Sequence, residues 1–192
     1  AQRAWEATRI NSLALLGFPH AAYRAGQRDL AVSVYRSIQA NEQLIIQAPT
    51  GLGKTIGTIF PAIKGLAPGL RNRVFYLSAK TSTQVLAEQA VLSIAAKGAR
   101  IRSITISAKS KVCFNPAQPC HPDHCEYAKG YYDRVDGAVA SLLEQSDHHN
   151  RTSIELIARQ HTVCPFELGL DLSRHSDLII SDYNYVFDPV VY

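Results

Sequence analysis

The sequence predicts an α/β fold in which helices cover a parallel sheet that carries a cysteine-rich, mainly helical insertion. Three observations support this. Short apolar runs alternate with helix-like segments, a glycine-rich loop joins one run to the next helix, and the alternation stops at Ala108 and resumes at Asp177. Strands that alternate with helices are typical of βαβ units, whose parallel strands are buried on both faces.

Apolar side chains at helical spacing predict four helices before Ala108, over residues 1–16, 26–39, 55–66 and 84–96. In the second of these, Leu30, Val34 and Ile38 recur every four residues. The third contains Pro61, which has no N–H to donate and is in tension with a continuous helix. A short apolar run predicts a buried strand over residues 44–48, residues 73–79 and 101–107 are predicted as further strands, and residues 177–181 resume the buried-strand pattern.

Composition limits the class of protein. The chain has 192 residues, of which 46% are hydrophobic and 19% charged, so it can build a core and is not disordered as a whole. No apolar run approaches the roughly 20 residues that span a bilayer, and charges at Arg3, Glu6 and Arg9 interrupt the N-terminal segment as no signal peptide would allow. We expect a soluble, cytoplasmic protein without a membrane partner, although a nuclear location stays open. A net charge of +4 permits an anionic partner.

The segment that breaks the alternation is about 60 residues long and contains every cysteine of the chain. It also contains several prolines, a polar tract over 145–151 and two expected helices. We therefore predict three parts: residues 1–107 begin an α/β domain, residues 108–168 form the insertion, and residues 169–192 return to the α/β domain.

The glycine-rich loop reads APTGLGKT and predicts a phosphate-binding site. In such a loop, successive backbone N–H groups at a helix N-terminus cradle phosphate oxygens. Lys54 would bridge the β- and γ-phosphates of ATP, and the Thr55 hydroxyl would help to hold Mg²⁺. Ala48 replaces the first glycine of the general pattern, so the alternative is a glycine-rich turn that happens to contain a lysine. The candidate nucleotide-binding residues are Ala48, Pro49, Thr50, Gly51, Leu52, Gly53, Lys54 and Thr55.

The four cysteines are the candidate metal ligands. Six, four and 38 residues separate Cys113, Cys120, Cys125 and Cys164 in turn. Without a secretion signal, this pattern indicates metal or cluster ligation rather than disulfides. Thiolates suit zinc and iron–sulfur clusters alike. A zinc site usually has a second short Cys-x-x-Cys hook, which is missing here, but the histidines at 121 and 124 could substitute. Unligated core cysteines are disfavoured, because the neighbours are proline, asparagine and histidine.

Other segments accompany these two motifs in a fixed order. They are Tyr23–Gln27 about 20 residues before the phosphate loop, Lys109–Cys113 and Cys164–Leu168 at the two ends of the insertion, and then Asp177–Ile180 and Asn184–Pro189. This order resembles the iron–sulfur DNA helicases of the XPD–DinG group in superfamily 2, over about residues 23–191.

The resemblance implies an incomplete RecA-like motor domain in which the four cysteines hold a 4Fe–4S cluster. It also implies that Gln27 reads the adenine edge of ATP, supported by Arg24. A surface helix start is the alternative for these two residues. ATP, Mg²⁺ and the cluster are the expected cofactors.

The segment after the second expected strand corresponds to motif Ia of that family. The resemblance implies that Thr81, Thr83 and Gln84 contact the phosphates of a DNA strand, at the sheet edge where α/β ligands bind. An ordinary helix N-cap by Ser82 or Thr83 is the alternative.

A second stretch with a nucleic-acid pattern spans residues 97–134 and has seven Lys/Arg against three Asp/Glu, with Phe114 and three tyrosines interleaved. Basic groups and aromatic rings together suit single-stranded nucleic acid, although such a pattern is often a solvated face. The candidate phosphate contacts are Lys109, Lys111, Lys129 and Arg134.

The last expected strand ends at Asp182 and looks like a Walker B strand, but Tyr183 follows where a helicase has its catalytic glutamate. In the family, the DEAH box comes one strand later, so Asp182 receives no magnesium role. We expect the N-terminal part of a larger ATP-dependent DNA helicase, inactive alone, with 5′→3′ polarity on single-stranded or forked DNA in repair or replication-fork processing. Its protein partners are unknown. The alternatives are a zinc-stapled nucleic-acid-binding module with a vestigial phosphate loop, and a P-loop kinase or other small-molecule NTPase, for which no substrate residues are evident.

Overall fold

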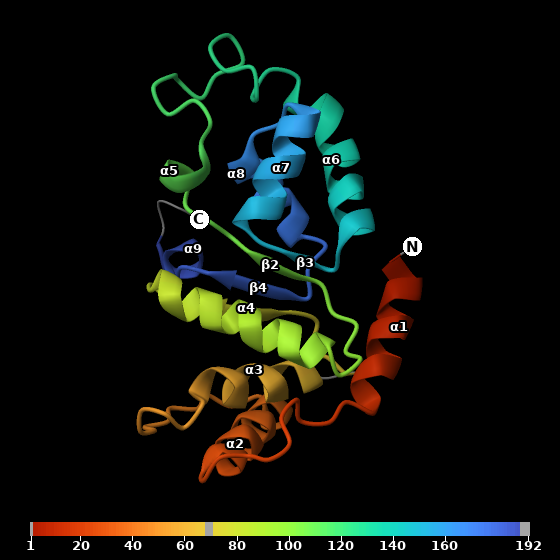
Figure 1. Ribbon diagram of the computed structural model, residues 1–192, viewed down its shortest axis with the longest axis vertical. Coiled ribbons are helices and arrows are strands. Elements are labelled where there is room, and N and C mark those ends of the chain that lie inside the picture. The colour runs from red at the N-terminus through yellow and green to blue at the C-terminus, as the bar shows by residue number, and fades with distance from the viewer. Residues whose placement is uncertain (1, 68–70, 189–192) are drawn as a thin grey trace. The chain divides into compact units, whose positions relative to one another are not determined.

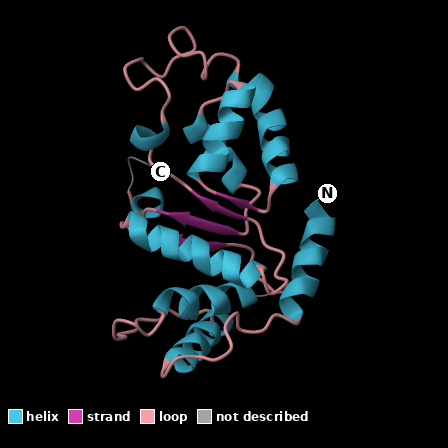
Figure 2. Cartoon of the chain, in the orientation of Figure 1, coloured by secondary structure: helices cyan, strands magenta, loops and turns pink. Residues whose placement is uncertain are grey.

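The computed structural model describes residues 2–67 and 71–188, which form two compact units, residues 1–101 and 102–192 (Figure 1). Residues 189–192, which include the last residue of the Asn184–Pro189 motif, lie outside the described residues. The protein is an α/β protein with a small parallel sheet, as the sequence predicts (Figure 2). Within the described ranges, no helix is both long and apolar enough to cross a membrane.

The first unit contains the four predicted helices and one strand. Its elements are α1 (Gln2–Ala14), α2 (Gln27–Ala40), α3 (Lys54–Lys64), β1 (Val74–Leu77) and α4 (Thr81–Ala95). Among the apolar positions that predicted them, Leu13 and Leu30 are buried, whereas Val34 and Ile38 are half-buried. Pro61 lies inside α3 and the helix continues past it, with the Pro61 carbonyl accepting the N–H of Gly65 at 3.0 Å.

The strand predicted over residues 44–48 is absent, and that prediction is wrong. Residues 43–48 have neither helical nor strand structure, and Ile45 is 99% exposed. A strand is stabilised by hydrogen bonds to a neighbouring strand, and in the described part of the chain no backbone bond joins this run to another segment. Apolar composition alone does not form a strand without that neighbour.

The second unit begins with the sheet. Its strands are β2 (Ser103–Thr105), β3 (His148–His149) and β4 (Leu178–Ser181), and β2 pairs in parallel with each of the other two. Ile104 lies opposite Ile179 on one side and His149 on the other. Every residue of β2 and β4 is buried, including the polar Ser103 and Thr105 of β2, as expected for parallel strands covered on both faces.

The predicted insertion belongs to this second unit. It contains α5 (Lys109–Val112), α6 (Tyr131–Gln145) and α7 (Arg151–His161), and α8 (Pro165–Ser173) begins at its end, while α9 (Asn184–Phe187) follows β4. Residues 113–130 form a long loop between α5 and α6 (Figure 2). Side chains from α6, α7 and α8 pack with β2 and β4 into one core that includes Ile104, Leu142 and Leu168. This core gives the irregular loop a fixed base.

Candidate nucleotide-binding loop and cysteine site

The phosphate loop has the backbone shape that its glycines predict. Gly51 and Gly53 have φ angles of 83° and 82°, a conformation that other residues rarely adopt. Gly53 is the N-cap of α3, so the helix begins at Lys54. The loop therefore leads directly into a helix N-terminus, whose free N–H groups favour phosphate.

Lys54 contacts its own loop. Its exposed ammonium group donates to the carbonyl oxygens of Ala48, at 3.1 Å, and Pro49, at 2.9 Å. Thr55 follows in the first turn of α3 and is half-buried. The lysine that would contact phosphate is thus held at the mouth of the loop by acceptors that a phosphate would replace.

Gln27 and Arg24 also contact the loop. Gln27 is 2% exposed, and its amide oxygen accepts the backbone N–H of Arg24 while its Nε2 donates to the Gly53 carbonyl at 3.1 Å. The Arg24 guanidinium donates to the carbonyl of Gly51 at 2.6 Å. The structure thus joins these two residues to the phosphate loop, from 26 and 27 positions away. Their role in reading adenine stays a prediction.

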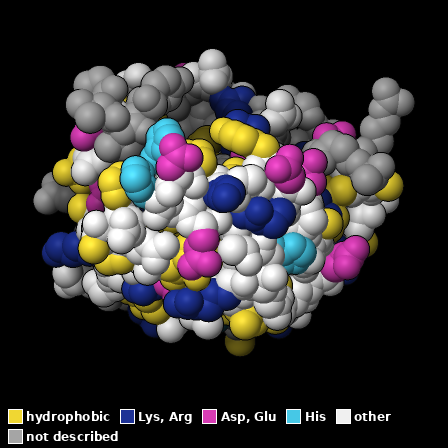
Figure 3. Space-filling view, turned by 90° about the horizontal axis from the view of Figure 1, so that it is seen from above, with side chains coloured by type: hydrophobic (Ala, Val, Ile, Leu, Met, Phe, Trp, Pro, Cys, Tyr) yellow, Lys and Arg dark blue, Asp and Glu magenta, His cyan; other side chains and the backbone are white. Residues whose placement is uncertain are grey.

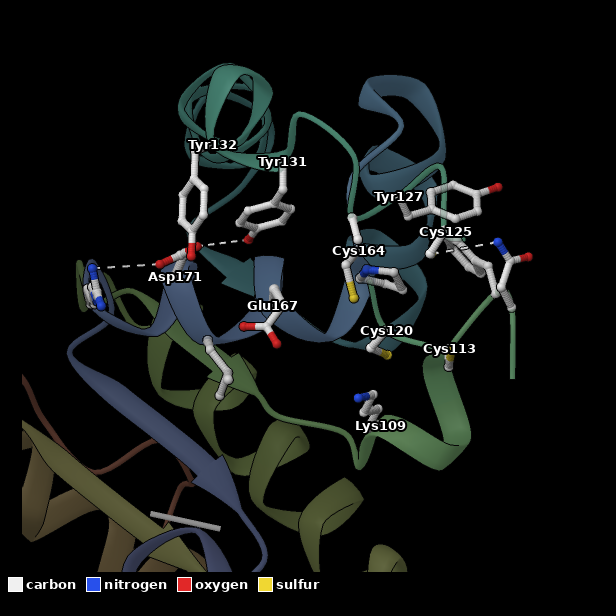
Figure 4. Close-up of a pocket in the computed structure, with 16 residues that line it drawn as sticks. Lys109, Cys113, Cys120, Cys125, Tyr127, Tyr131, Tyr132, Cys164, Glu167 and Asp171 are labelled. Atoms are coloured by element: carbon white, nitrogen blue, oxygen red, sulfur yellow. Dashed lines mark hydrogen bonds and ion pairs between the residues drawn. The ribbon is translucent and has the colours of Figure 1, made fainter. Parts of the chain in front are cut away.

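All four cysteines line one cavity of about 470 Å³ in the second unit (Figure 4). Cys113 follows the last turn of α5, Cys120 and Cys125 lie on the long loop, and Cys164 is the N-cap of α8. All four are free thiols. Cys113 and Cys164 are 51 positions apart in the sequence, yet all four cysteines line the same cavity, as residues that bind one shared group must.

N–H groups are directed at three of the sulfurs. The amide Nδ2 of Asn115 donates to Cys125 Sγ at 3.7 Å. A hydrogen bond to Cys120 raises the pKa of Lys109, which holds that ammonium group charged beside the cysteines. Burial raises the pKa of the Cys164 thiol, and the backbone N–H groups of Phe166 and Glu167 act against this. These donors favour electron-rich sulfur.

The described residues form no ready-made metal site. Within the described ranges, no three His, Cys, Asp or Glu side chains converge closely enough to hold one metal. Tetrahedral zinc would need sulfurs about 3.8 Å apart, given Zn–S bonds of about 2.3 Å. The rings of His121 and His124, the two substitute ligands, are 6.1 Å apart, and Nδ1 of His121 lies 3.2 Å from Asp123.

Two contacts at this cavity were not predicted from the sequence. One is the Asn115 bond to Cys125; the other joins the Tyr131 hydroxyl to Asp171 Oδ2 at 2.8 Å. Burial, helped by that bond, raises the pKa of Tyr131 well above its ordinary value. Arg174 forms an ion pair with the same carboxylate at 3.7 Å. No spacing rule joins residues 40 positions apart, so no sequence signal for the tyrosine–aspartate contact existed.

The candidate motif Ia residues lie at the start of α4. Lys80 is the N-cap, so the alternative of capping by Ser82 or Thr83 is wrong. The turn before the helix is instead closed by Ser78, whose hydroxyl accepts the N–H of Lys80 at 3.3 Å. Gln84 donates its Nε2 to the Ser78 carbonyl at 2.8 Å. Thr81 is exposed and Thr83 half-buried, and contact with DNA stays a prediction for all three candidates.

The four basic candidates differ in their surroundings. Lys109, Lys111 and Lys129 are exposed, whereas Arg134 is half-buried and donates to backbone carbonyls. On the face seen in Figure 3, Lys and Arg side chains are interspersed with acidic ones instead of forming an unbroken basic tract. Asp182 accepts the N–H of Asn184 at 2.9 Å at the start of α9.

Comparison with known proteins gives a partial match. No model of a known protein family matches the chain. Over 68 residues, 35% of its length, the chain is 35% identical to a protein from Methanocaldococcus jannaschii described as a probable ATP-dependent helicase. The match spans 10% of that protein's length. Part of the chain is therefore related in sequence to a helicase.

Proposed function

We propose that the chain is the N-terminal part of the first motor domain of an ATP-dependent DNA helicase of the iron–sulfur XPD–DinG group. The observation that carries the proposal is the joining of Gln27 and Arg24 to the phosphate loop, because neither lies near that loop in the sequence. The identity to a probable ATP-dependent helicase supports the same conclusion. In a RecA-like motor, these residues and the loop surround one nucleotide.

The chain's own residues have defined roles toward ATP and Mg²⁺. The N–H groups at the start of α3 would hold phosphate oxygens, and Lys54 would exchange the carbonyls of Ala48 and Pro49 for the β- and γ-phosphates. The Thr55 hydroxyl would complete the contacts of a bound Mg²⁺. Hydrolysis also needs an acidic residue to hold the metal, which we assign to a DEAH box outside this chain.

We propose that the cysteine site holds a 4Fe–4S cluster. Four thiols line one cavity of about 470 Å³, much wider than a single ion needs, and three sulfurs have nearby N–H donors of the kind that stabilise cluster thiolates. Cys113, Cys120, Cys125 and Cys164 would hold it. When bound, the cluster would fasten the long loop to α8 and could exchange one electron. The exposed lysines and motif Ia would contact single-stranded or forked DNA, with 5′→3′ translocation in repair or replication-fork processing as the family implies.

The nucleotide part of the proposal is tested in the protein encoded by the whole reading frame. Lys54→Ala should abolish DNA-stimulated ATP hydrolysis without loss of folding, because the side chain is exposed. Arg36→Ala, which removes an exposed cation from α2, is the matched control and should retain activity. Full ATP hydrolysis in the Lys54 variant would refute the proposed role of the loop.

A further inference from the structure

The guanidinium group of Arg134 lies where backbone carbonyls from two separate segments converge. Its Nη2 donates to the carbonyl oxygens of Lys129, at 2.5 Å, Thr162, at 2.7 Å, and Glu126, at 3.3 Å. Three carbonyl oxygens that point at one position repel one another unless a cation lies between them. Hydrogen bonds to a charged donor are also stronger than neutral ones. Arg134 therefore acts as a charged tie between the two segments.

Each of these segments carries a cysteine of the cavity. Glu126 directly follows Cys125, and the Lys129 N–H bonds back to the Cys125 carbonyl at 3.0 Å. Thr162 is the C-cap of α7 and lies two residues before Cys164. The tie made by Arg134 thus fixes the distance between the chain at Cys125 and the chain at Cys164.

The neighbouring backbone is shaped to admit the guanidinium group. Gly130, the N-cap of α6, has a φ of 62°, and a Cβ there would lie 2.9 Å from Arg134 Nη1. Thr162 has a φ of 53°, which is uncommon for a residue that is not glycine. Its carbonyl receives one of the three bonds. Both unusual conformations occur on the segments that Arg134 joins.

We propose that Arg134 is a positioning residue of the cysteine site, which holds Cys125 and Cys164 at the separation that the proposed cluster requires. The inference rests on the proposed function and assigns Arg134 a role different from the phosphate contact predicted from the sequence. A single nitrogen, Nη2, donates to both segments, and the planar guanidinium group holds that nitrogen in a fixed orientation, whereas a lysine ammonium group is a point charge on a flexible stem. Replacement of a residue that orients a metal ligand typically lowers metal affinity by about 10- to 100-fold.

The test compares full-length wild-type protein with Arg134→Gln, Arg134→Lys and a control, Arg151→Ala. Arg151 makes a surface ion pair with Glu155 on α7 and is not among the residues that line the cysteine cavity. Iron release to a chelator, followed by visible absorption under anaerobic conditions, should be about 10- to 100-fold faster in Arg134→Gln. It should be intermediate in Arg134→Lys and unchanged in the control. Affinity for a single-stranded oligonucleotide should be equal in all four proteins at matched cluster content.

The opposite pattern would overturn the inference: unchanged iron release in Arg134→Gln with weakened oligonucleotide binding would make Arg134 a phosphate contact. Loss of cooperative folding in both Arg134 variants would overturn it too, because the residue would then support the whole unit.

If the wild-type protein holds no iron, the proposed cluster fails, and amide hydrogen exchange on metal-free protein decides the inference separately. Faster exchange over residues 126–131 in Arg134→Gln, with β2 and β4 unchanged, would still support the tie. Unchanged exchange over residues 126–131 would refute it.

Discussion

Gln27 and Gly53 are in direct contact, although 26 residues separate them: Nε2 of Gln27 donates to the Gly53 carbonyl, and a Cβ on Gly53 would collide with that same nitrogen. Gly53 is therefore needed for two reasons, its left-handed backbone and the close approach of a buried amide. Gly51 has the same backbone conformation, but a Cβ there would meet no atom within 4 Å. Alanine substitutions at Gly51 and Gly53 therefore separate the effect of the backbone conformation from the effect of the contact with Gln27.

Gly51→Ala should destabilise the protein by about 1–2 kcal/mol, the ordinary cost of placing alanine in a left-handed conformation. Gly53→Ala should cost about 1–3 kcal/mol more, because it also displaces the buried Gln27 amide from its partners. Denaturant unfolding measures both, and nucleotide affinity should fall further in Gly53→Ala. Equal losses of stability in the two variants would show that the Gln27–Gly53 contact contributes nothing.

Tyr131 makes the second unit sensitive to alkaline pH. Burial and the bond to Asp171 raise its pKa above the ordinary value of 10.0, so the folded state favours the neutral phenol. The stabilisation is complete below about pH 10 and is lost as pH rises beyond that value. Tyr131→Phe should cost about 1 kcal/mol at neutral pH, from the lost hydrogen bond, and should flatten the alkaline decline of stability.

Tyr132→Phe is the control for this prediction, because Tyr132 is 87% exposed. Its unfolding free energy should match the wild type at every pH. An alkaline decline that persists unchanged in Tyr131→Phe would contradict the assignment.

His149 makes the same unit sensitive to acid. Its side chain is buried beside β2, and that burial lowers its pKa from the ordinary value of 6.5, although the Ser146 carbonyl partly opposes the effect. The folded state therefore favours neutral imidazole. Stability is complete above about pH 6.5 and is lost as pH falls through the lowered folded-state pKa. His149→Gln should remove this part of the acid dependence. The measurement is the unfolding free energy at steps of about one pH unit, from about pH 4 to about pH 8.

His175→Gln provides the comparison, because His175 is exposed. It should retain the acid dependence of the wild type. If both variants retain it, a group other than His149 causes the loss of stability.

Asn115 should tune the proposed cluster through its bond to Cys125. Hydrogen bonds to cluster sulfurs are among the factors that set reduction potentials, and they favour the more electron-rich, reduced state. Asn115→Leu should therefore lower the midpoint potential in an anaerobic redox titration while the iron content stays constant. Gln118→Ala, an exposed amide on the same loop, should leave the potential unchanged. Equal potentials in the wild type and Asn115→Leu would contradict the role of this bond.

Sequence patterns predicted those parts of the fold that depend on local interactions. Leu13 of α1 and Leu30 of α2 each belong to a helical apolar pattern and are buried, and the segments predicted as strands at β2 and β4 form buried parallel strands. The prediction of a strand at residues 44–48 was wrong because strand formation depends on a neighbouring strand, which sequence periodicity does not show. β3 was missed for the converse reason: it lies in a polar tract, and its place comes from pairing with β2, not from its own composition.

For the candidate sites, residue types were predictable and their partners were not. The glycines and Lys54 follow from a motif, and the cysteines stand out by their clustering. Contacts such as Arg134 with Thr162 or Tyr131 with Asp171 join residues on different helices or loops. They depend on how α6, α7 and α8 pack, which follows from the shared core and not from any local pattern.

The content of iron, acid-labile sulfide and zinc in anaerobically purified full-length protein tests the central claim most directly. A 4Fe–4S cluster held by Cys113, Cys120, Cys125 and Cys164 predicts about four irons and four sulfides per chain, and little zinc. Cys164→Ser should reduce both iron and sulfide. Stoichiometric zinc without iron or sulfide would contradict the account and favour a zinc-stapled nucleic-acid-binding module.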